Sequence, residues 1–289
     1  MAVSFRRQVA NLIERVSGNL VIAPYDVHGL QERMHLRRLF QHYAVDCVFD
    51  VGANDGQYAG FLRQSVGYSG HVVSYEPIPE LAQRLTERAT ATQDTMWHIE
   101  NLALDQEAGP AVFHIAQSNQ FSSLRPAAAD QPARFAQENS MVRDVVVQRA
   151  TMATELVKWQ ECLGFRRPFL KMDTQGNDLA VVTGAGPGLK TFVGLQTELA
   201  IRRLYEGAPE FSETLSSLSA KGFEPSAFVP NNNAHFPELY EVDCICITET
   251  CGSAVYCAKY PPSTVSVCPV TNPLAALAKN TAAPAISTS

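Results

Sequence analysis

Four carboxylates stand at or just after four apolar segments of the chain, where they could bind or activate a polar ligand. The acids are Asp50, Glu76, Asp173 and Glu198. Each apolar segment is typical of a buried strand, and ligands of an open α/β sheet bind beyond the carboxyl ends of its strands. We therefore expect the four acids to surround one crevice, where they can accept hydrogen bonds or protons.

The first of these segments, VFDVGANDGQY at residues 48–58, combines a strand, a glycine turn and the start of a helix. Residues 45–51 predict the strand and residues 58–65 the helix, with a tight turn between them. Such a turn exposes backbone N–H groups to a ligand. From this segment we expect cofactor contacts by Asp50, Gly52, Asn54, Gly56 and Tyr58.

The turn favours S-adenosylmethionine over a dinucleotide. A dinucleotide site requires G-x-G-x-x-G, but Asn54 and Gln57 occupy the second and third glycine positions. A pyrophosphate would also face the negative charge of Asp50, whereas the ammonium group of S-adenosylmethionine would not. A purely structural glycine turn is the alternative.

Glu76 follows a second predicted strand, residues 72–75, and lies 20 positions after Gly56. Nucleotide-binding folds place there the acid that binds the ribose hydroxyls. Pro77, directly after it, is expected to contact the cofactor as well, and Pro77 and Pro79 stiffen the exit from the strand. The alternative is that Glu76 only caps the following helix. After a third strand, predicted at residues 95–104, an adenine ring could lie against the next side chains. These side chains are Ala103 and Leu104, and Asp105 or a backbone group could bind the amino group of the adenine. The alternative is that this segment is an ordinary end of a strand with no ligand.

Four motifs resemble the FkbM-type S-adenosylmethionine-dependent methyltransferases. They are VFDVGANDGQY, VVSYEPIPELAQRL, FLKMDTQGND and VGLQTELA, in this order, and the resemblance covers about residues 36–248. It implies a class I methyltransferase fold and O-methylation of a sugar, polyketide or similar hydroxylated metabolite. The chain departs from the family pattern at Gln175, where the family usually has Glu, and at Ala153, where it usually has Asp.

Asp173 is the best candidate for the base that takes the proton of an acceptor hydroxyl, with Lys171 and Glu198 as positioning neighbours. Lys171 and Asp173 point to the same face of a strand, so a structural ion pair is one alternative. Asp173 and Glu198 could also hold a divalent ion. The losses at Gln175 and Ala153 make this ion less favoured, and His235 is a further candidate base.

Strands alternate with helices along the chain, which predicts a doubly wound, mostly parallel α/β sheet. By resemblance it is the seven-stranded, Rossmann-like class I methyltransferase sheet, with the last two strands antiparallel. A fifth strand is predicted at residues 191–196. We expect an N-terminal helical extension over residues 1–44, the methyltransferase domain over 45–250, and a cysteine-containing, disordered tail over 251–289.

The composition excludes several classes of protein. A net charge of −6 argues against a general nucleic-acid binder, and no apolar run approaches the length of a membrane span. The N-terminus is too polar for a secretory signal, so a cytoplasmic location is expected. The same segment is typical of an amphipathic helix that packs on the domain, forms a homo-oligomer or lies on a membrane. Cys244 and Cys246 alternate along a predicted strand and should share one face. With Cys251, Cys257 and Cys268 they make five irregularly spaced thiols, which are a poor template for zinc.

Together these features predict an S-adenosylmethionine-dependent O-methyltransferase. Its partner would be a small hydroxylated acceptor such as a sugar, a polyketide or a glycolipid precursor. A non-catalytic cofactor-binding or scaffold protein is the first alternative, because of Gln175 and Ala153. A nicotinamide-dependent oxidoreductase is the second, and the failed glycine spacing counts against it.

Overall fold

The computed structural model of the protein describes residue 16 and residues 29–230 and 237–248. Contacts divide the chain into Met1–Cys251 and Gly252–Ser289, and every helix and strand named below belongs to the first unit. Most of the predicted N-terminal helix, the candidate base His235 and the predicted disordered tail lie outside the described residues. The first described element is helix α2, Leu30–His42.

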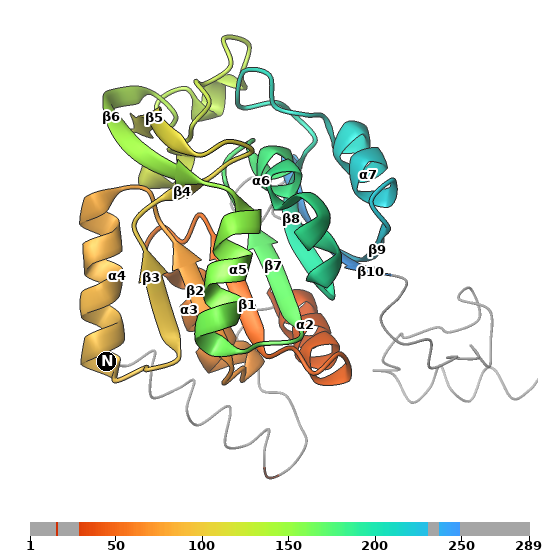
Figure 1. Ribbon diagram of the computed structural model, residues 1–289. Coiled ribbons are helices and arrows are strands. Elements are labelled where there is room, and N and C mark those ends of the chain that lie inside the picture. The colour runs from red at the N-terminus through yellow and green to blue at the C-terminus, as the bar shows by residue number, and fades with distance from the viewer. Residues whose placement is uncertain (1–15, 17–28, 231–236, 249–289) are drawn as a thin grey trace, which may run out of the picture. The chain divides into compact units, whose positions relative to one another are not determined.

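A seven-stranded sheet forms the centre of the first unit (Figure 1), in the order β3-β2-β1-β7-β8-β10-β9. Neighbouring strands are parallel except β10, which runs antiparallel to both β8 and β9. This confirms the predicted doubly wound, mostly parallel sheet and its antiparallel final pair. The bounds are β1 Cys47–Val51, β2 His71–Tyr75, β3 Trp97–Glu100, β7 Pro168–Met172, β8 Gly194–Ala200, β9 Phe223–Pro230 and β10 Glu241–Thr248.

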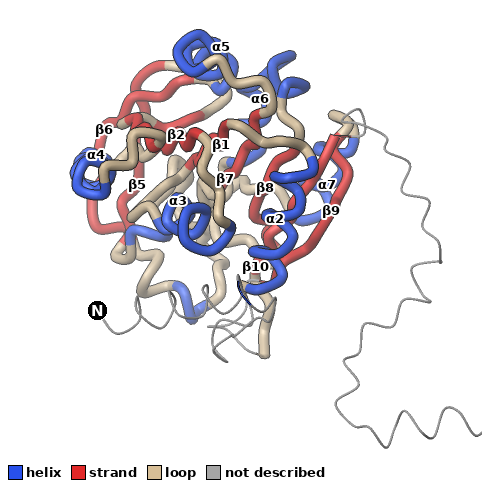
Figure 2. The backbone as a smooth tube through the Cα atoms, turned by 90° about the horizontal axis from the view of Figure 1, so that it is seen from below, coloured by secondary structure: helices blue, strands red, loops and turns tan. Residues whose placement is uncertain are grey.

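Helices cover both faces of this sheet (Figure 2), so its central strands β1 and β7 are buried on both sides. Their residues are apolar except Asp50 and Lys171. Successive residues of β1 point into opposite cores: Val48 packs with α2 and α4, and Phe49 packs with α5 and α6. The other helices are α3 Gln57–Phe61 with the π-helical turn Leu62–Val66, α4 Pro79–Thr92, α5 Met152–Leu163, α6 Asp178–Ala185 with the 3-10 helix Gly186–Thr191, and α7 Phe211–Ser219.

The predicted third strand at residues 95–104 is wrong as a single element. Asn101 interrupts it, because its side-chain amide donates to the carbonyl oxygens of Glu76 and Pro77 at 2.9 and 3.2 Å. Residues before the break form β3 and residues after it form β4, Ala103–Leu104. With β5, Gly109–Ala116, and β6, Met141–Ala150, strand β4 builds a separate three-stranded sheet in the order β4-β6-β5.

The predicted fifth strand, residues 191–196, is displaced along the chain. Residues up to Thr191 belong to a 3-10 helix, and β8 runs from Gly194 to Ala200 because β10 pairs with that whole length. Glu198 therefore lies inside a strand rather than after it. Two short 3-10 helices between β5 and β6, Asn119–Phe121 and Ala133–Phe135, complete the described elements. No helix among the described residues is long and apolar enough to span a bilayer.

The turn after β1 depends on Gly52, whose φ is +80°. A Cβ atom there would lie 2.0 Å from the backbone oxygen of Asp173. Gly52→Ala should therefore destabilise the protein by about 1–2 kcal/mol for the left-handed backbone and by about 1–3 kcal/mol more for the collision. Urea unfolding of the variant measures this loss.

Gly67 provides the matched control, because its φ is +78° and no described atom lies within 4 Å of its built Cβ. Gly67→Ala should lose only the backbone contribution of about 1–2 kcal/mol. Equal losses in the two variants would show that the approach of Gly52 to Asp173 does not constrain the turn.

Candidate active site

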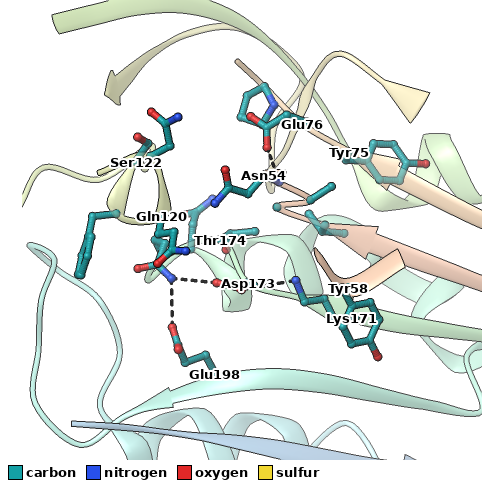
Figure 3. Close-up of a pocket in the computed structure, with 18 of the residues that line it drawn as sticks. Asn54, Tyr58, Tyr75, Glu76, Gln120, Ser122, Lys171, Asp173, Thr174 and Glu198 are labelled. Carbon is teal, nitrogen blue, oxygen red and sulfur yellow. Dashed lines mark hydrogen bonds and ion pairs between the residues drawn. The ribbon is translucent and has the colours of Figure 1, made fainter. Parts of the chain in front are cut away.

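A cavity of about 720 Å³ opens at the carboxyl ends of the parallel strands. Ten of the twelve residues predicted for the site line it, and Figure 3 shows several of them pointing into the same space. The ten are Gly52, Asn54, Tyr58, Glu76, Pro77, Ala103, Leu104, Lys171, Asp173 and Glu198. Asp50 and Gly56 do not line the cavity.

Asp50 is wholly buried beneath the cavity floor, so the prediction that it contacts a cofactor is not supported. Its carboxylate accepts a hydrogen bond from the Ser74 hydroxyl at 3.0 Å and lies 3.3 Å from the Lys171 ammonium. The Trp97 indole N–H in turn donates to the Ser74 oxygen at 3.0 Å. Asp50 therefore contacts Lys171 rather than the cavity, and it affects the site only by holding that lysine in place.

Gly56 is needed for the packing of helix α3 and does not contact the ligand space. It precedes the helix with φ +72°, and a Cβ atom there would lie 2.8 Å from Leu85 and 3.0 Å from Trp97. A side chain would thus collide with the core behind the turn. The neighbouring Gln57, which the sequence interpretation did not select, lines the cavity.

Glu76 and Asn54 form one wall of the cavity (Figure 3). The Glu76 carboxylate accepts hydrogen bonds from the backbone N–H groups of Asn54, at 2.7 Å, and Ile78, at 2.8 Å. Burial raises the pKa of Glu76 to about 7, although these two donors oppose the shift. The side-chain oxygen of Asn54 is buried without a hydrogen-bond partner among the described residues, which is a position for a ligand donor.

The far wall of the cavity is apolar and fits a flat ring. Leu102, Ala103 and Leu104 line it together with Ile78 and Phe113. Asp105, which was expected near an adenine amino group, does not line the cavity. The Arg149 guanidinium holds its carboxylate at 2.6 Å, and the Asn177 amide donates to it at 3.3 Å. That ion pair turns the acid away from the ligand space.

Lys171 is the central cation of the site and is only 7% exposed. Its ammonium lies 3.3 Å from Asp50 and 3.5 Å from Asp173, and 5.1 Å above the centre of the Tyr58 ring. Although burial disfavours the charged lysine, the two carboxylates prevail and raise its pKa. The predicted Lys171–Asp173 pair is thus part of a triad that includes Asp50.

Gln175 connects Asp173 and Glu198, the two acids that were predicted to be catalytic. Its side-chain N–H group donates to Asp173 at 2.8 Å and to Glu198 at 3.3 Å. Its oxygen accepts a hydrogen bond from the Tyr205 hydroxyl at 2.6 Å. A glutamate here, as in the usual family pattern, would place a third negative charge between two carboxylates. The amide instead bridges them.

The polar residues of the cavity that sequence reasoning missed include Glu32, Gln196, Glu241 and Asp243. Gln196 accepts from the Tyr58 hydroxyl at 3.0 Å and donates to Glu32 at 2.7 Å. On β10, Glu241 and Asp243 share one face by the two-residue period, and Asp243 stands opposite Glu198 on β8. The alternation of acids along this strand is the sequence feature that could have predicted these two residues as part of the site.

Burial, and then the neighbouring carboxylates, raise the pKa of Glu198, Glu241 and Asp243 above their ordinary values. Among the described residues, no group of three or more acids, histidines or cysteines has a geometry that could hold a metal ion. Cys244 and Cys246, whose shared face was predicted, are buried with their sulfur atoms 3.4 Å apart.

A family model described as the methyltransferase FkbM domain matches residues 50–225, which is more than half of the chain. The chain belongs to this family. The resemblance predicted from the four motifs is thereby confirmed, and the seven-stranded sheet with its antiparallel β10 is the Rossmann-like fold of the class I methyltransferases.

Individual relatives are distant. A protein-L-isoaspartate O-methyltransferase from Ignicoccus hospitalis is 39% identical over 75 residues, so the match spans 26% of this chain and a third (33%) of that relative. An O-methyltransferase from Bacillus cereus, solved in complex with SAH, aligns with 83% of this chain and 97% of its own at 11% identity and a TM-score of 0.43. The methyltransferase FkbM from Methylobacillus flagellatus aligns with 85% of this chain and 60% of its own, at 13% identity and a TM-score of 0.41.

The buried triad of Lys171, Asp50 and Asp173 should contribute measurably to the free energy of unfolding of this FkbM-family protein. Lys171→Met should destabilise it by about 3–5 kcal/mol, because the Asp50 charge would stay buried without its cation. Asp50→Asn should also destabilise it. The double variant should lose less than the sum of the single losses by about 0.5–3 kcal/mol, which is the range for residues in contact.

Urea unfolding of the four proteins completes this double-mutant cycle. Arg143→Met is the control: that arginine pairs with Glu80, and their side chains are 52% and 62% exposed, so its loss should cost less than 1 kcal/mol. If the stability losses of the Lys171 and Asp50 single variants add up exactly to the loss of the double variant, the two residues are not coupled.

Proposed function

We propose that the protein is an S-adenosylmethionine-dependent O-methyltransferase that acts on a hydroxyl group of a sugar or natural-product-type small molecule. The observation that carries this proposal is the composition of one continuous cavity. An apolar wall at Ala103 and Leu104, the Glu76–Asn54 wall and the acids around Lys171 all line it. In an FkbM-family fold, these three parts suit the base, the ribose and the sulfonium-bearing end of the methyl donor.

The described residues fit such a donor. We assign the ribose hydroxyls to Glu76, the adenine ring to Ala103 and Leu104 beside Pro77, and the polar end to the backbone at Gly52 and to Asn54. The partnerless buried oxygen of Asn54 supports this fit, because it would gain a donor from the ligand. When bound, S-adenosylmethionine supplies an electrophilic methyl group.

The residues of the chain supply position and a proton acceptor. Lys171 holds Asp173 through the ion pair at 3.5 Å, and Gln175 ties Asp173 to Glu198. A carboxylate of this group takes the proton of the acceptor hydroxyl. Asp173, Lys171 and Glu198 thus remain the proposed catalytic group, and Tyr58 positions Lys171 with its ring.

The two rival hypotheses now differ in strength. Membership of a methyltransferase family leaves the nicotinamide oxidoreductase without support. A non-catalytic cofactor-binding protein remains the second candidate, because Gln175 fills the place of the usual acid. Against it stands the hydrogen-bonded role of Gln175 between Asp173 and Glu198, which keeps both acids directed at the cavity.

Binding and turnover test the proposal together. Calorimetry should detect S-adenosylmethionine and S-adenosylhomocysteine but not NAD. Transfer of a tritiated methyl group to a panel of methyl glycosides, sugar nucleotides and hydroxylated polyketides should identify an acceptor, and EDTA should not reduce that rate. Binding of S-adenosylmethionine without transfer to any member of the panel would favour the non-catalytic cofactor-binding protein. Binding of NAD would contradict both that alternative and the methyltransferase.

Glu76→Gln tests the ribose assignment, because it removes the charge and keeps the size of the side chain. Affinity for S-adenosylhomocysteine should fall by about 1.5–3 kcal/mol, or about 10- to 150-fold. In the wild type the affinity should also fall as the pH drops below about 7, because binding then requires a proton to leave Glu76. The variant should lack this dependence.

Glu80→Gln is the control for this measurement, since Glu80 lies on the exposed side of α4 in an ion pair with Arg143. An unchanged affinity in Glu76→Gln would remove Glu76 from the cofactor site. The melting temperature must be recorded as well. Glu76 is only 4% exposed and accepts two backbone hydrogen bonds, so the stability of the variant should fall as well.

A further inference from the structure

Two consecutive hydrogen bonds connect helix α2 with the aromatic ring beside Lys171. The Tyr58 hydroxyl donates to the side-chain oxygen of Gln196 at 3.0 Å, and the Gln196 amide donates to the carboxylate of Glu32 at 2.7 Å. The Lys171 ammonium lies 5.1 Å from the centre of the Tyr58 ring (Figure 3). All four residues line the cavity, although they come from four different elements, α2, α3, β7 and β8.

The register of the sheet places Gln196 next to Lys171. On β7, Lys171 is paired with Gln196 of β8 on one side and with Asp50 of β1 on the other. Paired residues of neighbouring strands project to the same face of a sheet, so the lysine has an acid on one side and an amide on the other. Gln196 is only 3% exposed, and a buried amide requires partners for both its oxygen and its nitrogen. Tyr58 and Glu32 are these partners.

The chemistry of the three groups fixes the direction of both hydrogen bonds. The Glu32 carboxylate is an acceptor, so the nitrogen of the Gln196 amide faces it and the amide oxygen faces the Tyr58 hydroxyl. The opposite orientation would place the amide oxygen against the carboxylate, where two acceptors repel each other. If Glu32 lost its acceptor oxygen, the buried N–H group of Gln196 would lose this partner.

Helix α2 holds Glu32 in a fixed place. The side chain of Gln31 donates to the carbonyl oxygen of Phe228 on the edge strand β9 at 3.3 Å. Further along the helix, the Arg37 guanidinium donates to the carbonyl oxygen of Val66 at 3.1 Å, at the end of the helical segment that begins with α3. The helix is therefore tied both to the edge of the sheet and to the segment whose ring contacts the lysine.

The Tyr58 ring is held at both ends, by its backbone in α3 and by its hydroxyl on Gln196. A ring fixed in this way presents a constant face to a cation, which its π-electrons attract. The Lys171 ammonium thus has three neighbours: the ring, Asp50 at 3.3 Å and Asp173 at 3.5 Å. Without the hydroxyl contact the ring could turn about its side-chain bonds, and the lysine would lose one of these three supports.

We infer that Glu32 and Gln196 are positioning residues for the methyl transfer. Through the Tyr58 ring they fix the ammonium of Lys171, which in turn holds Asp173 for the acceptor hydroxyl. The inference rests on the proposed function. It also makes α2 part of the active site, although α2 precedes the part of the chain that the family model matches.

The first test measures methyl transfer to the acceptor that the panel of hydroxylated compounds identifies. Glu32→Leu should lower kcat by about 10- to 100-fold, because a displacement of about 1 Å in an active site can cost that much. The KM for S-adenosylmethionine should change little. Glu32→Gln keeps an acceptor oxygen at the same length and should restore most of the lost kcat. Equal losses in the two variants would show that the hydrogen bond to Gln196 is not what matters, and would overturn the inference.

Tyr58→Phe breaks the connection at its other end, because it removes the hydroxyl and keeps the ring. It should lower kcat to a similar extent, and it keeps the test decisive if Glu32→Leu fails to fold. The double variant should lose no more than the larger of the two single losses, because both changes break one connection. Single losses that multiply in the double variant would mean that Glu32 and Tyr58 act independently, contrary to the inference.

Glu87→Leu is the matched control. Glu87 on α4 accepts a hydrogen bond from the Gln83 amide at 2.9 Å, which is the same kind of contact as that between Gln196 and Glu32, but on the exposed surface. This variant should keep the kcat of the wild type. A loss comparable with that of Glu32→Leu would show that the effect does not depend on the contact with Lys171.

The last measurement needs no acceptor. In the ligand-free, full-length protein labelled with ¹⁵N-lysine, NMR follows the ammonium group of Lys171, which is identified by its absence in Lys171→Arg. Its signal should shift or disappear in Glu32→Leu and Tyr58→Phe, and should stay near its wild-type position in Glu32→Gln and Glu87→Leu. The melting temperature of each variant confirms that it is folded.

The two measurements separate failure of this inference from failure of the proposed function. An unchanged Lys171 signal in folded Glu32→Leu, or a wild-type kcat in that variant, would overturn the inference and leave the proposed function intact. If the signal responds but the wild type neither binds S-adenosylhomocysteine nor transfers a methyl group, the proposed function is overturned. In that case the role in catalysis is overturned with it, and only the positioning of Lys171 by Glu32 stands.

Discussion

The site depends on one buried ammonium group, that of Lys171, at the carboxyl edge of the central sheet. Taking a lysine out of water is costly, but the ion pairs of Lys171 with Asp50 below it and Asp173 beside it outweigh this cost and raise the pKa of the lysine. The register of the sheet makes this possible, since Asp50 on β1 lies directly opposite Lys171 on β7. Removing the lysine would leave Asp50 buried without compensation, so the fold and the site are stabilised by the same contact.

The triad also explains how the protein tolerates the acids of the cavity wall. Directly opposed like charges across a strand pair, such as Glu198 and Asp243, destabilise a sheet. Lys171 neutralises only part of this charge, and burial together with the neighbouring carboxylates raises the pKa values of Glu198, Glu241 and Asp243. A cluster of acids that lowers the stability of the fold at one edge of a mostly apolar sheet is typical of a functional site.

The sequence was informative where one short segment contains both the structural signal and the chemical group. The strand–glycine–helix segment at residues 48–58 and the acid after β2 are local features, and most of their side chains do line the cavity. The sequence failed where a side chain's surroundings come from distant segments. Asp50 looks like a ligand contact until Lys171, 121 positions later, is seen to cover it, and Glu241 lines the cavity only because β10 inserts between β8 and β9.

Gln175 shows why a departure from a family pattern needs its structural context. Read from the motif alone, the loss of an acid suggested the loss of a metal site or of activity. In the structure the amide donates to Asp173 and Glu198 and accepts from Tyr205, so all its contacts require a group with both N–H and oxygen atoms. A carboxylate could not donate to either acid without carrying a proton itself. A neutral donor at position 175 therefore holds Asp173 and Glu198 together without adding to their charge.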